Sequence, residues 1–482
     1  MGQSSDDKEQ SDIQQNKSFQ YQKSDMIEKE VSPMKYRVLQ YIIAICSIVW
    51  IIIDAVYGDK FFKWNYSFAY SLQNGDSDPS LPKYKIFTII SYLGQEELIA
   101  VFVLFGFIFF ANKIQALKIL IGTMVAVYLI CFLKLWYTDP RPYFVYPDLQ
   151  GIGCDPEFGK PSGHALITSV LFYLMFDSFV NKKIFSPVIT QQDDKQQYKE
   201  TRVVDIEMIP QDSSNNSPQQ QGQSLNIKEI IYQERFLNSF IYLPIYLALL
   251  LLVGFARIIL GAHSFNQVLL GWAYGLLYIL FYRQKLEKFI ENSLLIVIDK
   301  KFENDKQKIK YLFIMTAIYI IALALSMIFY YIADNSVTQS QKIQYKTNFM
   351  SHSYCQNSFD NHTFLAGECI LDCAVLSLIY GVYVSCISLN GTYQPDLWNQ
   401  NYKNLQLSKK IIRVITTLVL VAIPYILFSL YKIDNQYLYF LFRSNLKYLF
   451  VALFLIRLQP FVFKITKLEI DGDLLKLLSN QN

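Results

Sequence analysis

The chain has 482 residues, of which 52% are hydrophobic, 16% aromatic and only 17% charged. This is too apolar for a soluble domain of this length, so the composition indicates a polytopic membrane protein. The net charge of +4 is small and the lysines are scattered, which gives no basis for a nucleic-acid partner. Seven cysteines without CxxC pairs or Cys/His clusters argue against a zinc site.

The first 36 residues are polar and of mixed charge, and they contain no apolar segment of the kind found in signal peptides. We expect a disordered tail there. Beyond it, ten segments have the roughly 20 mostly apolar residues that a membrane-spanning helix needs. The predicted spans are 38–57, 88–111, 114–133, 163–180, 237–256, 264–282, 311–332, 365–389, 411–430 and 437–463. The predicted fold class is therefore all-α, a polytopic transmembrane helix bundle of about ten spans.

The second predicted span is the least regular, because it contains Gln95, Glu96 and Glu97. Carboxylates within the hydrocarbon are costly unless they face a cavity or the interface. We expect these side chains to lie near the membrane interface, with the apolar helix running on from Leu98.

The orientation follows from the short loops that are rich in lysine and arginine. Three basic segments fall on one side of a ten-span bundle: "YRQKLEKFIENSLLIVIDKKFENDKQKIK" after the sixth span, "NYKNLQLSKK", and the C-terminal "KITKLEIDGDLLKLL". This side is predicted to be cytosolic. It also receives both termini and the insert 181–236, whose Gln-, Ser- and Asn-rich composition predicts disorder.

The opposite side receives the loops 58–87, 134–162, 257–263, 333–364 and 431–436. Glycosylation sequons at Asn65 and Asn361 give weak support for a lumenal or extracellular face. Further sequons at Asn215 and Asn390 fall on the predicted cytosolic side, so sequons alone decide nothing.

Three polar patches lie at span ends on the non-cytosolic side. "KLWYTDPRP" carries Lys134 and Arg141, "PSGH" occupies 161–164, and "ARIILGAH" carries Arg257 and His263. Singly, each has an ordinary explanation as a snorkelling lysine, an Arg-Pro turn or an interfacial histidine. Together they place three cations and two histidines at one membrane depth, which requires an anionic ligand to offset the repulsion. Phosphate fits.

The chemistry of these residues suits phosphoryl transfer. Arg141 and Arg257 can each offer a planar fork to phosphate oxygens, and Lys134 adds a compact charge. Ser162 and Gly163, at the start of a helix, add a hydroxyl and backbone N–H donors.

The two histidines can divide the remaining work. One attacks phosphorus as a neutral imidazole, and the other donates a proton to the leaving oxygen and then activates water. These residues require no metal and no other cofactor, because the positive side chains do what a metal ion would do.

In this order, the motifs resemble the three-part signature of the type 2 phosphatidic acid phosphatase (PAP2) superfamily: KxxxxxxRP, PSGH and SRxxxxxHxxxD. The resemblance implies a PAP2/haloperoxidase-like catalytic core. It implies His263 as the nucleophile and His164 as the acid/base. It further implies these phosphate ligands: Lys134, Arg141, Ser162, Gly163 and Arg257.

Two positions depart from that signature. Ala256 stands where the family has serine, and Gln267 stands where it has the aspartate that orients the nucleophile. Gln267 lies one turn after His263, so its side-chain oxygen can accept the imidazole N–H and orient the ring. It supplies no negative charge.

The glucose-6-phosphatase branch also carries glutamine there, and further features are similar to it. The active-site loop passes through Cys154, four spans follow the third motif, and a late outward loop carries Cys355. Typical lipid phosphatases of the superfamily end after six spans. Cys154 and Cys355 fall on the same oxidising side, where they can pair or stay as free thiols, since sequence supplies no geometry. The branch's enzyme has nine spans, and the extra first span here keeps the active site lumenal.

The expected organisation is a disordered cytosolic tail (1–36), an extra N-terminal span (37–61), a catalytic core (85–285, with the insert 181–236) and a C-terminal four-span region (311–465). We expect an endoplasmic-reticulum phosphohydrolase that removes phosphate from a sugar monophosphate, most of all glucose 6-phosphate, on the lumenal face through a phosphohistidine. Membrane lipids surround it, and a substrate transporter is a candidate partner.

Two alternatives stay open. The first is a lipid phosphate phosphatase acting on a sphingoid-base phosphate, phosphatidate or polyprenyl diphosphate. The second is a non-catalytic membrane protein that binds a phosphorylated ligand, an alternative motivated by Gln267 and Ala256.

Overall fold

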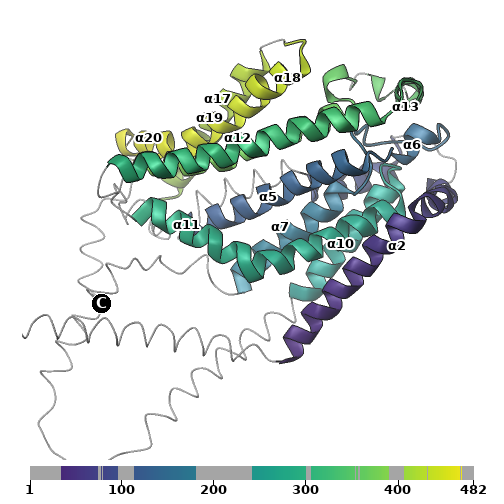
Figure 1. Cartoon of the computed structure of the whole chain (residues 1–482), viewed down its shortest axis with the longest axis horizontal. Helices are drawn as coiled ribbons and strands as arrows, with labels where there is room; N and C mark the ends of the chain where they lie inside the picture. The colour runs from purple at the N-terminus through teal and green to yellow at the C-terminus, as the bar shows by residue number, and fades with distance from the viewer. Residues whose placement is uncertain are drawn as a thin grey trace, which may run out of the picture.

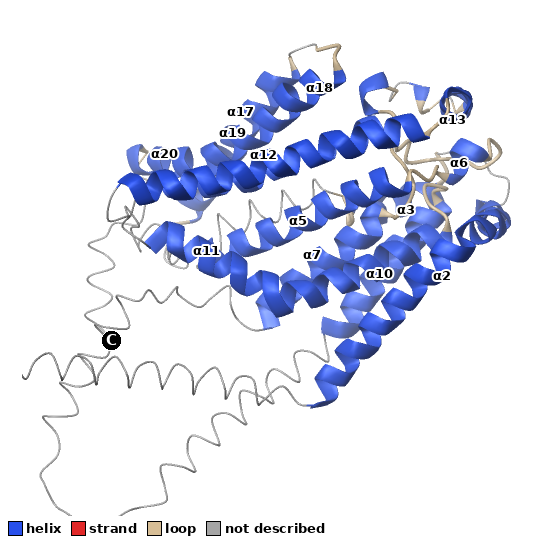
Figure 2. Ribbon diagram, in the orientation of Figure 1, coloured by secondary structure: helices blue, strands red, loops and turns tan. Residues whose placement is uncertain are grey.

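Helices are the only regular elements in the part of the chain that the structure, a computed structural model, describes (Figure 2). The described residues are 34–73, 78, 80–95, 113–180, 242–299, 305–352, 354–356, 359–389, 406–430, 433–466 and 468. The all-α prediction is confirmed over these ranges. The expected disorder of 1–33 and of the insert 181–236 falls outside them.

The helices follow one another as shown in Figure 1. The first half of the described chain contains α2 (Met34–Gln73), α3 (Pro82–Tyr92), α5 (Lys113–Tyr137), α6 (Pro142–Val145), α7 (Gly163–Val180), an unlabelled helix (Tyr242–Ile259), α10 (Phe265–Phe281), η1 (Tyr282–Leu286) and α11 (Glu287–Asp299). The second half contains α12 (Asp305–Ser336), α13 (Gln339–Ser351), η3 (Asn361–Thr363), α14 (Ala366–Asp372), α15 (Val375–Leu389), α17 (Leu407–Ser429), α18 (Gln436–Leu438), η5 (Tyr439–Asn445), α19 (Leu446–Leu453), η6 (Phe454–Leu458) and α20 (Gln459–Ile465).

Nine helical stretches of the described chain are long and apolar enough to cross a membrane. They are Val38–Gln73, Ile114–Val145, Gly163–Val180, Tyr242–Ile259, Phe265–Val297, Asp305–Ser336, Ala366–Ser388, Leu407–Ser429 and Gln436–Phe463. Each overlaps a span predicted from the sequence. The remaining predicted span, 88–111, begins within α3, and its part from 96 onward, with Glu96 and Glu97, lies outside the described residues.

The first span is longer at both ends than predicted. α2 begins at Met34, inside the expected tail, and runs to Gln73, so the expected loop 58–87 begins as helix. No proline interrupts the sequence from 58 to 73, and a single glycine does not stop a helix that is packed along its length. The predicted end at 57 is therefore wrong.

The basic loop expected after the sixth span is also helical over most of its length. α10, η1 and α11 follow one another without a break to Asp299. Lys118 of α5 binds this extension through ion pairs to Glu287 (3.1 Å) and Glu291 (2.6 Å). The segment contains neither glycine nor proline before 300, and the ion pairs give its polar face a partner.

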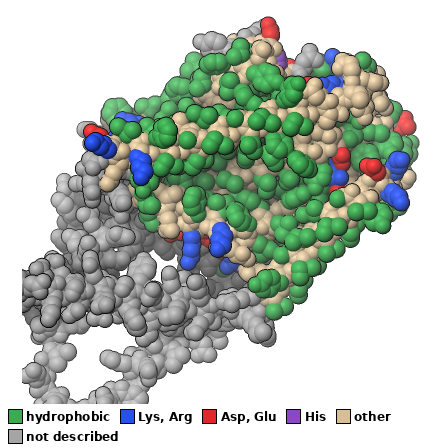
Figure 3. Space-filling view, in the orientation of Figure 1, with side chains coloured by type: hydrophobic (Ala, Val, Ile, Leu, Met, Phe, Trp, Pro, Cys, Tyr) green, Lys and Arg blue, Asp and Glu red, His purple; other side chains and the backbone are tan. Residues whose placement is uncertain are grey.

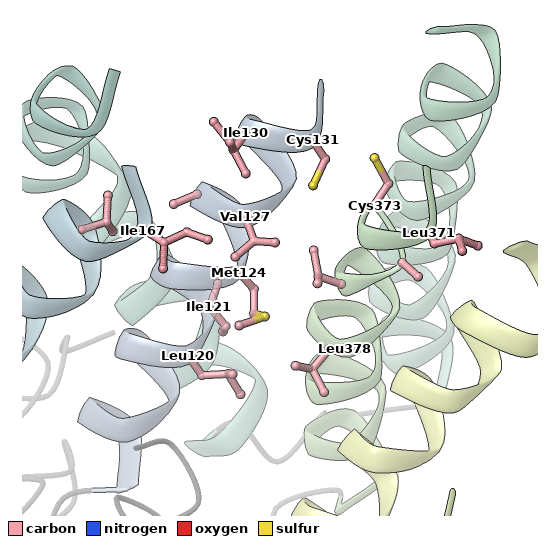
Figure 4. Packing of buried hydrophobic residues seen from close by; sticks show 14 of the residues in the cluster. Leu120, Ile121, Met124, Val127, Ile130, Cys131, Ile167, Leu371, Cys373 and Leu378 are labelled. Carbon is pink, nitrogen blue, oxygen red and sulfur yellow. The ribbon is translucent and has the colours of Figure 1, made fainter. Parts of the chain in front are cut away.

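The core of the bundle lies around α5. Figure 4 shows Met124 and Val127 of α5 between Ile167 of α7 and Leu378 of α15. α5 also packs against α12 and α14, while α2 lies along α10 at the edge of the bundle (Figure 1). Since α5 is covered on several sides, its C-terminal end delivers side chains to a buried position.

The outside of the bundle is apolar. In Figure 3, hydrophobic side chains cover most of the visible face, whereas charged side chains gather toward its ends. Phe313, Ile321 and Ile332 of α12, for example, are more than half exposed. Such a surface is stable in lipid and not in water, in agreement with a multi-pass membrane protein.

Irregular segments gather at one end of the bundle, beside α3, α6 and α13 (Figure 2). Apart from the short helices α6 and η3, they join α5 to α7 (138–162), the helix 242–259 to α10 (260–264) and α13 to α14 (described at 352, 354–356 and 359–365). All three sequence motifs lie at this end.

Candidate active site

The first motif places two cations at the end of α5. Lys134 lies in the last turn of α5, and Arg141 directly precedes α6. The Arg141 side chain is fully buried, and its Nε and Nη1 donate to the carbonyls of Glu157 (2.8 Å) and Ala262 (2.9 Å). Arg141 therefore ties the loop before α7 to the turn before α10.

Two carboxylates that the sequence analysis did not single out lie among the cations. Glu157 Oε1 is 2.5 Å from Lys134 Nζ and 2.6 Å from Arg141 Nη2. Asp155 Oδ2 pairs with Arg257 and lies 3.3 Å from Arg141 Nη1. The only sequence signal for them is their place in "CDPE", between the first and second motifs.

Both carboxyl groups are ionised at neutral pH. Burial opposes their charge, but Arg257 and Arg141 hold the pKa of Asp155 below its usual range. Arg141 and Lys134 likewise outweigh burial and lower the pKa of Glu157. The two carboxylates therefore offset two of the three positive charges of Lys134, Arg141 and Arg257, and a bound phosphoryl group must compete with these carboxylates.

His263 lies at the end of the turn that follows the helix 242–259, and its side chain is fully buried. Its Nδ1 is 2.8 Å from the carbonyl oxygen of Gly159, and its Nε2 is 3.2 Å from Arg141 Nη1. Because a carbonyl can only accept, Nδ1 carries the proton, and Nε2 has the lone pair. Burial first, and then Arg141, Arg257 and Lys134, hold the pKa of His263 well below its ordinary value, so the ring is neutral.

Gln267 does not orient His263 directly, contrary to the sequence prediction. Its Oε1 accepts from the backbone N–H of Ser264 (3.2 Å), and its Nε2 donates to the carbonyl of Pro140 (3.0 Å). The imidazole N–H is taken by Gly159, which packs against the Gln267 amide. A glutamine at the third position of a helix reaches its own N-cap more readily than a side chain in the preceding turn, which explains the difference.

The second motif starts α7. Ser162 donates its backbone N–H to the Gln267 carbonyl (3.0 Å), and its hydroxyl accepts from the N–H of Ala165 (3.4 Å), as an N-cap does. A side chain at Gly163 would begin 3.6 Å from Lys134 Nζ, so the first turn of α7 directly faces that cation. His164 Nε2 is buried and has no hydrogen-bond partner among the residues that the structure describes.

All eight predicted site residues lie in this one cluster. Lys134, Arg141 and Arg257 are connected through the two carboxylates, and His263 contacts Arg141. Repulsion from His164 also helps to lower the pKa of His263, after burial and the three cations. The site combines buried cations, a neutral imidazole and a helix N-terminus.

The C-terminal region contacts the same loop. A disulfide bond joins Cys154 to Cys355, 201 residues apart, so of the two states left open by the sequence the structure has the paired one. Nearby, the backbone N–H of Leu365 donates to the Pro156 carbonyl (2.9 Å), and Tyr354 Oη donates to Gln150 Oε1 (3.1 Å). The last four spans are thereby attached to the candidate site.

The described chain thus combines an apolar helix bundle, typical of a membrane protein, with a buried cluster of cations, carboxylates and histidines at one end. Residues 115–291 match the family model of the PAP2 superfamily, and this range contains every predicted site residue. This segment is therefore similar to the PAP2 superfamily domain, and members of that superfamily are phosphatases that act on phosphorylated substrates. No curated protein and no solved structure matches the chain.

Proposed function

We propose that the chain is a membrane phosphohydrolase that removes phosphate from a sugar monophosphate, most of all glucose 6-phosphate, through a phosphohistidine on His263. The observation that carries the proposal is the state of that imidazole. Its Nδ1 donates to Gly159, its Nε2 carries the lone pair, and its nearest cationic neighbour is Arg141. A neutral, oriented imidazole beside a cation is the arrangement that an attack on phosphorus requires.

The first half of the reaction transfers the phosphoryl group to the protein. The oxygens of the phosphoryl group displace the Glu157 carboxylate and accept hydrogen bonds from Lys134 and Arg141. Arg257 is the third cation. His263 Nε2 attacks phosphorus, the bond to the sugar oxygen breaks, and His164 in its protonated form gives that oxygen a proton.

The second half releases phosphate. His164, now neutral, takes a proton from water, and the hydroxide attacks the phosphohistidine. The bond from phosphorus to Nε2 breaks, and His263 returns to its neutral form. The Gly159 carbonyl accepts from Nδ1–H throughout, so a backbone dipole supports the positive ring where an aspartate would otherwise lie.

Two features support a small sugar phosphate over a lipid phosphate. One is the resemblance to the glucose-6-phosphatase branch at Gln267 and in the four spans that follow the third motif. The other is the attachment of the C-terminal region to the active-site loop through Cys154 and Cys355. The proposed placement is the endoplasmic-reticulum membrane, with a lumenal site and cytosolic termini, supported by the basic segments on the opposite side.

The substrate is tested by phosphate release from detergent-purified protein with glucose 6-phosphate, other sugar phosphates, phosphatidate and sphingosine 1-phosphate. We expect kcat/KM to be highest for glucose 6-phosphate. Release from the lipids alone would overturn the sugar assignment and leave the mechanism standing. Binding of all these ligands without release from any would favour a non-catalytic protein.

The mechanism is tested by trapping labelled phosphate on the protein. His263→Ala is expected to abolish both turnover and labelling, whereas His164→Ala should lose turnover and still bind vanadate. His362→Ala is the matched control, because His362 hydrogen-bonds Gln436 outside the cluster. A labelled His263→Ala protein would refute the assignment of the nucleophile.

A further inference from the structure

α2 lies outside the segment that matches the PAP2 superfamily, yet it packs along α10, the helix that follows His263 (Figure 1). Much of α2 is exposed and apolar, for instance at Ile45, Ile52 and Val56. Its Asp54, in contrast, is only 1% exposed. A buried carboxylate within an apolar span is costly unless it has partners, so its contacts indicate what it is for.

Asp54 binds two segments of the candidate site at once. Its Oδ2 is 2.8 Å from Lys160 Nζ, and its Oδ1 accepts from Asn266 Nδ2 (2.9 Å). Lys160 is also 3.0 Å from Asp139, and Asn266 Oδ1 accepts from Ser264 Oγ (2.7 Å). All the groups in this network except Asp139 are nearly buried.

These two partners adjoin the groups that hold the nucleophile. Lys160 directly follows Gly159, whose carbonyl accepts from His263 Nδ1, and it precedes the second motif. Asn266 lies in the first turn of α10, three residues after His263. The distance between the Gly159 carbonyl and the imidazole therefore depends on two segments that Asp54 ties together.

A second polar contact of α2 supports the same alignment. Gln73 Nε2 donates to the carbonyls of Gln150 (2.8 Å) and Ile259 (3.1 Å), and its Oε1 accepts from the Gln150 N–H (2.9 Å). Gln73 thus joins the active-site loop to the end of the helix that carries Arg257. α2 holds the loop and the turn at two places.

We infer that Asp54 of α2 is a positioning residue of the catalytic centre: through Lys160 and Asn266 it fixes the Gly159 carbonyl against His263. The inference rests on the proposed function. It assigns the helix outside the PAP2 match to the catalytic unit. A misplacement of about 1 Å can reduce a rate by about 100-fold, so the loss of one such contact is measurable.

The test is Asp54→Asn in the full chain, with Asp59→Asn as the matched control, because Asp59 is an exposed aspartate on the same helix. Asparagine keeps an oxygen for Asn266 but loses the charge that holds Lys160. We expect Asp54→Asn to lower kcat by about 10-fold or more with KM within about twofold, and Asp59→Asn to match the wild type.

Trapped phosphate separates positioning from loss of fold. The fraction of protein that can be labelled gives the number of intact sites. A positioning defect therefore lowers the turnover per labelled site, whereas loss of fold lowers the labelled fraction. A fall in the labelled fraction alone, with unchanged turnover per site, would overturn the inference.

A double-mutant cycle with Lys160→Met tests the route. If Asp54 acts through Lys160, the double variant is expected to be no slower than the slower single variant. If the two single effects on kcat multiply in the double variant, Asp54 does not act through Lys160. Wild-type kcat in Asp54→Asn would refute the inference alone, whereas a wild-type protein that neither releases nor traps phosphate would refute the proposed function as well.

Discussion

The Nδ1–H group of His263 donates to a backbone carbonyl, that of Gly159, and not to a side chain. The sequence offers Gln267, one turn away, as a side-chain acceptor, but in the structure the Gly159 carbonyl accepts this hydrogen bond. Every residue has a carbonyl, so such an acceptor leaves no mark in the sequence. Motif spacing proposes His263 as the nucleophile, whereas the group that fixes its tautomer was not predictable from the sequence.

The neutral state of His263 predicts a pH dependence of stability. The pKa of His263 is held well below its ordinary value in the folded protein, so below about pH 6.5 the unfolded chain takes up a proton that the folded one refuses. The free energy of unfolding should therefore decrease as the pH is lowered below about 6.5. This residue contributes at most about 1.4 kcal/mol to the decrease per pH unit. Thermal unfolding between pH 7 and 5 is the measurement.

His263→Gln is the comparison for that experiment, because it removes this residue's titration and leaves that of His164. The carboxylates Asp155 and Glu157 have lowered pKa values, so their stabilisation is lost only below the ordinary value of about 4. The variant should lose less stability than the wild type over the same pH range. Parallel curves would mean that His263 is protonated in the folded protein.

The position of Glu157 indicates that its carboxylate competes with a bound phosphoryl group for Lys134 and Arg141. Its carboxylate takes N–H groups of Lys134 and Arg141 that a phosphoryl group needs. Glu157→Gln is expected to tighten vanadate binding by about tenfold, because a charge-assisted hydrogen bond no longer has to be broken. The inhibition constant of vanadate measures this, with the exposed Asp148→Asn as control. Weaker binding would show that the carboxylate chiefly supports the two cations.

The existence of the helices could be predicted from the sequence, but the residues at which they end could not. Each span of the described chain was visible in the hydropathy, but α2 and the α10–α11 extension continue past their predicted ends. Their continuations are polar or mixed, and contacts such as Lys118 with Glu291 stabilise them. Hydropathy reports what lipid tolerates and not where a helix stops.

The turn between the helix 242–259 and α10 depends on one glycine. Gly261 has φ +67°, and a side chain there would meet the Gln150 carbonyl. Gly261→Ala is expected to reduce stability by about 1–3 kcal/mol through backbone strain alone, with a further cost from that contact. The fall in Tm measures this loss of stability. We also expect turnover to fall, because His263 lies at the end of this turn. Gly163→Ala, whose nearest neighbour would be 3.6 Å away, should keep its Tm.

Because of the disulfide bond, we expect the C-terminal region to affect both the stability of the fold and the activity of the site. It closes a loop of 201 residues between the active-site loop and the C-terminal region. Cys355→Ser is expected to reduce the free energy of unfolding by about 2–5 kcal/mol and to lower turnover, since the loop loses a tether. Thermal unfolding without reductant measures the loss, and Cys46→Ser, an exposed free thiol, is the control. An equal Tm for both variants would mean that the bond does not stabilise the fold.

The sequence by itself determined the membrane class, the positions of the spans and the cations and histidines of the site, because hydropathy and motif spacing are properties of the chain read in order. The tertiary structure decided what holds those residues. The Gly159 carbonyl accepts from His263, Glu157 lies between Lys134 and Arg141, and Asp54 of α2 pairs with Lys160 beside Gly159. Asp54 and Asn266 are 212 residues apart. No pattern along one chain reports such a pair, since only folding brings the two groups into contact.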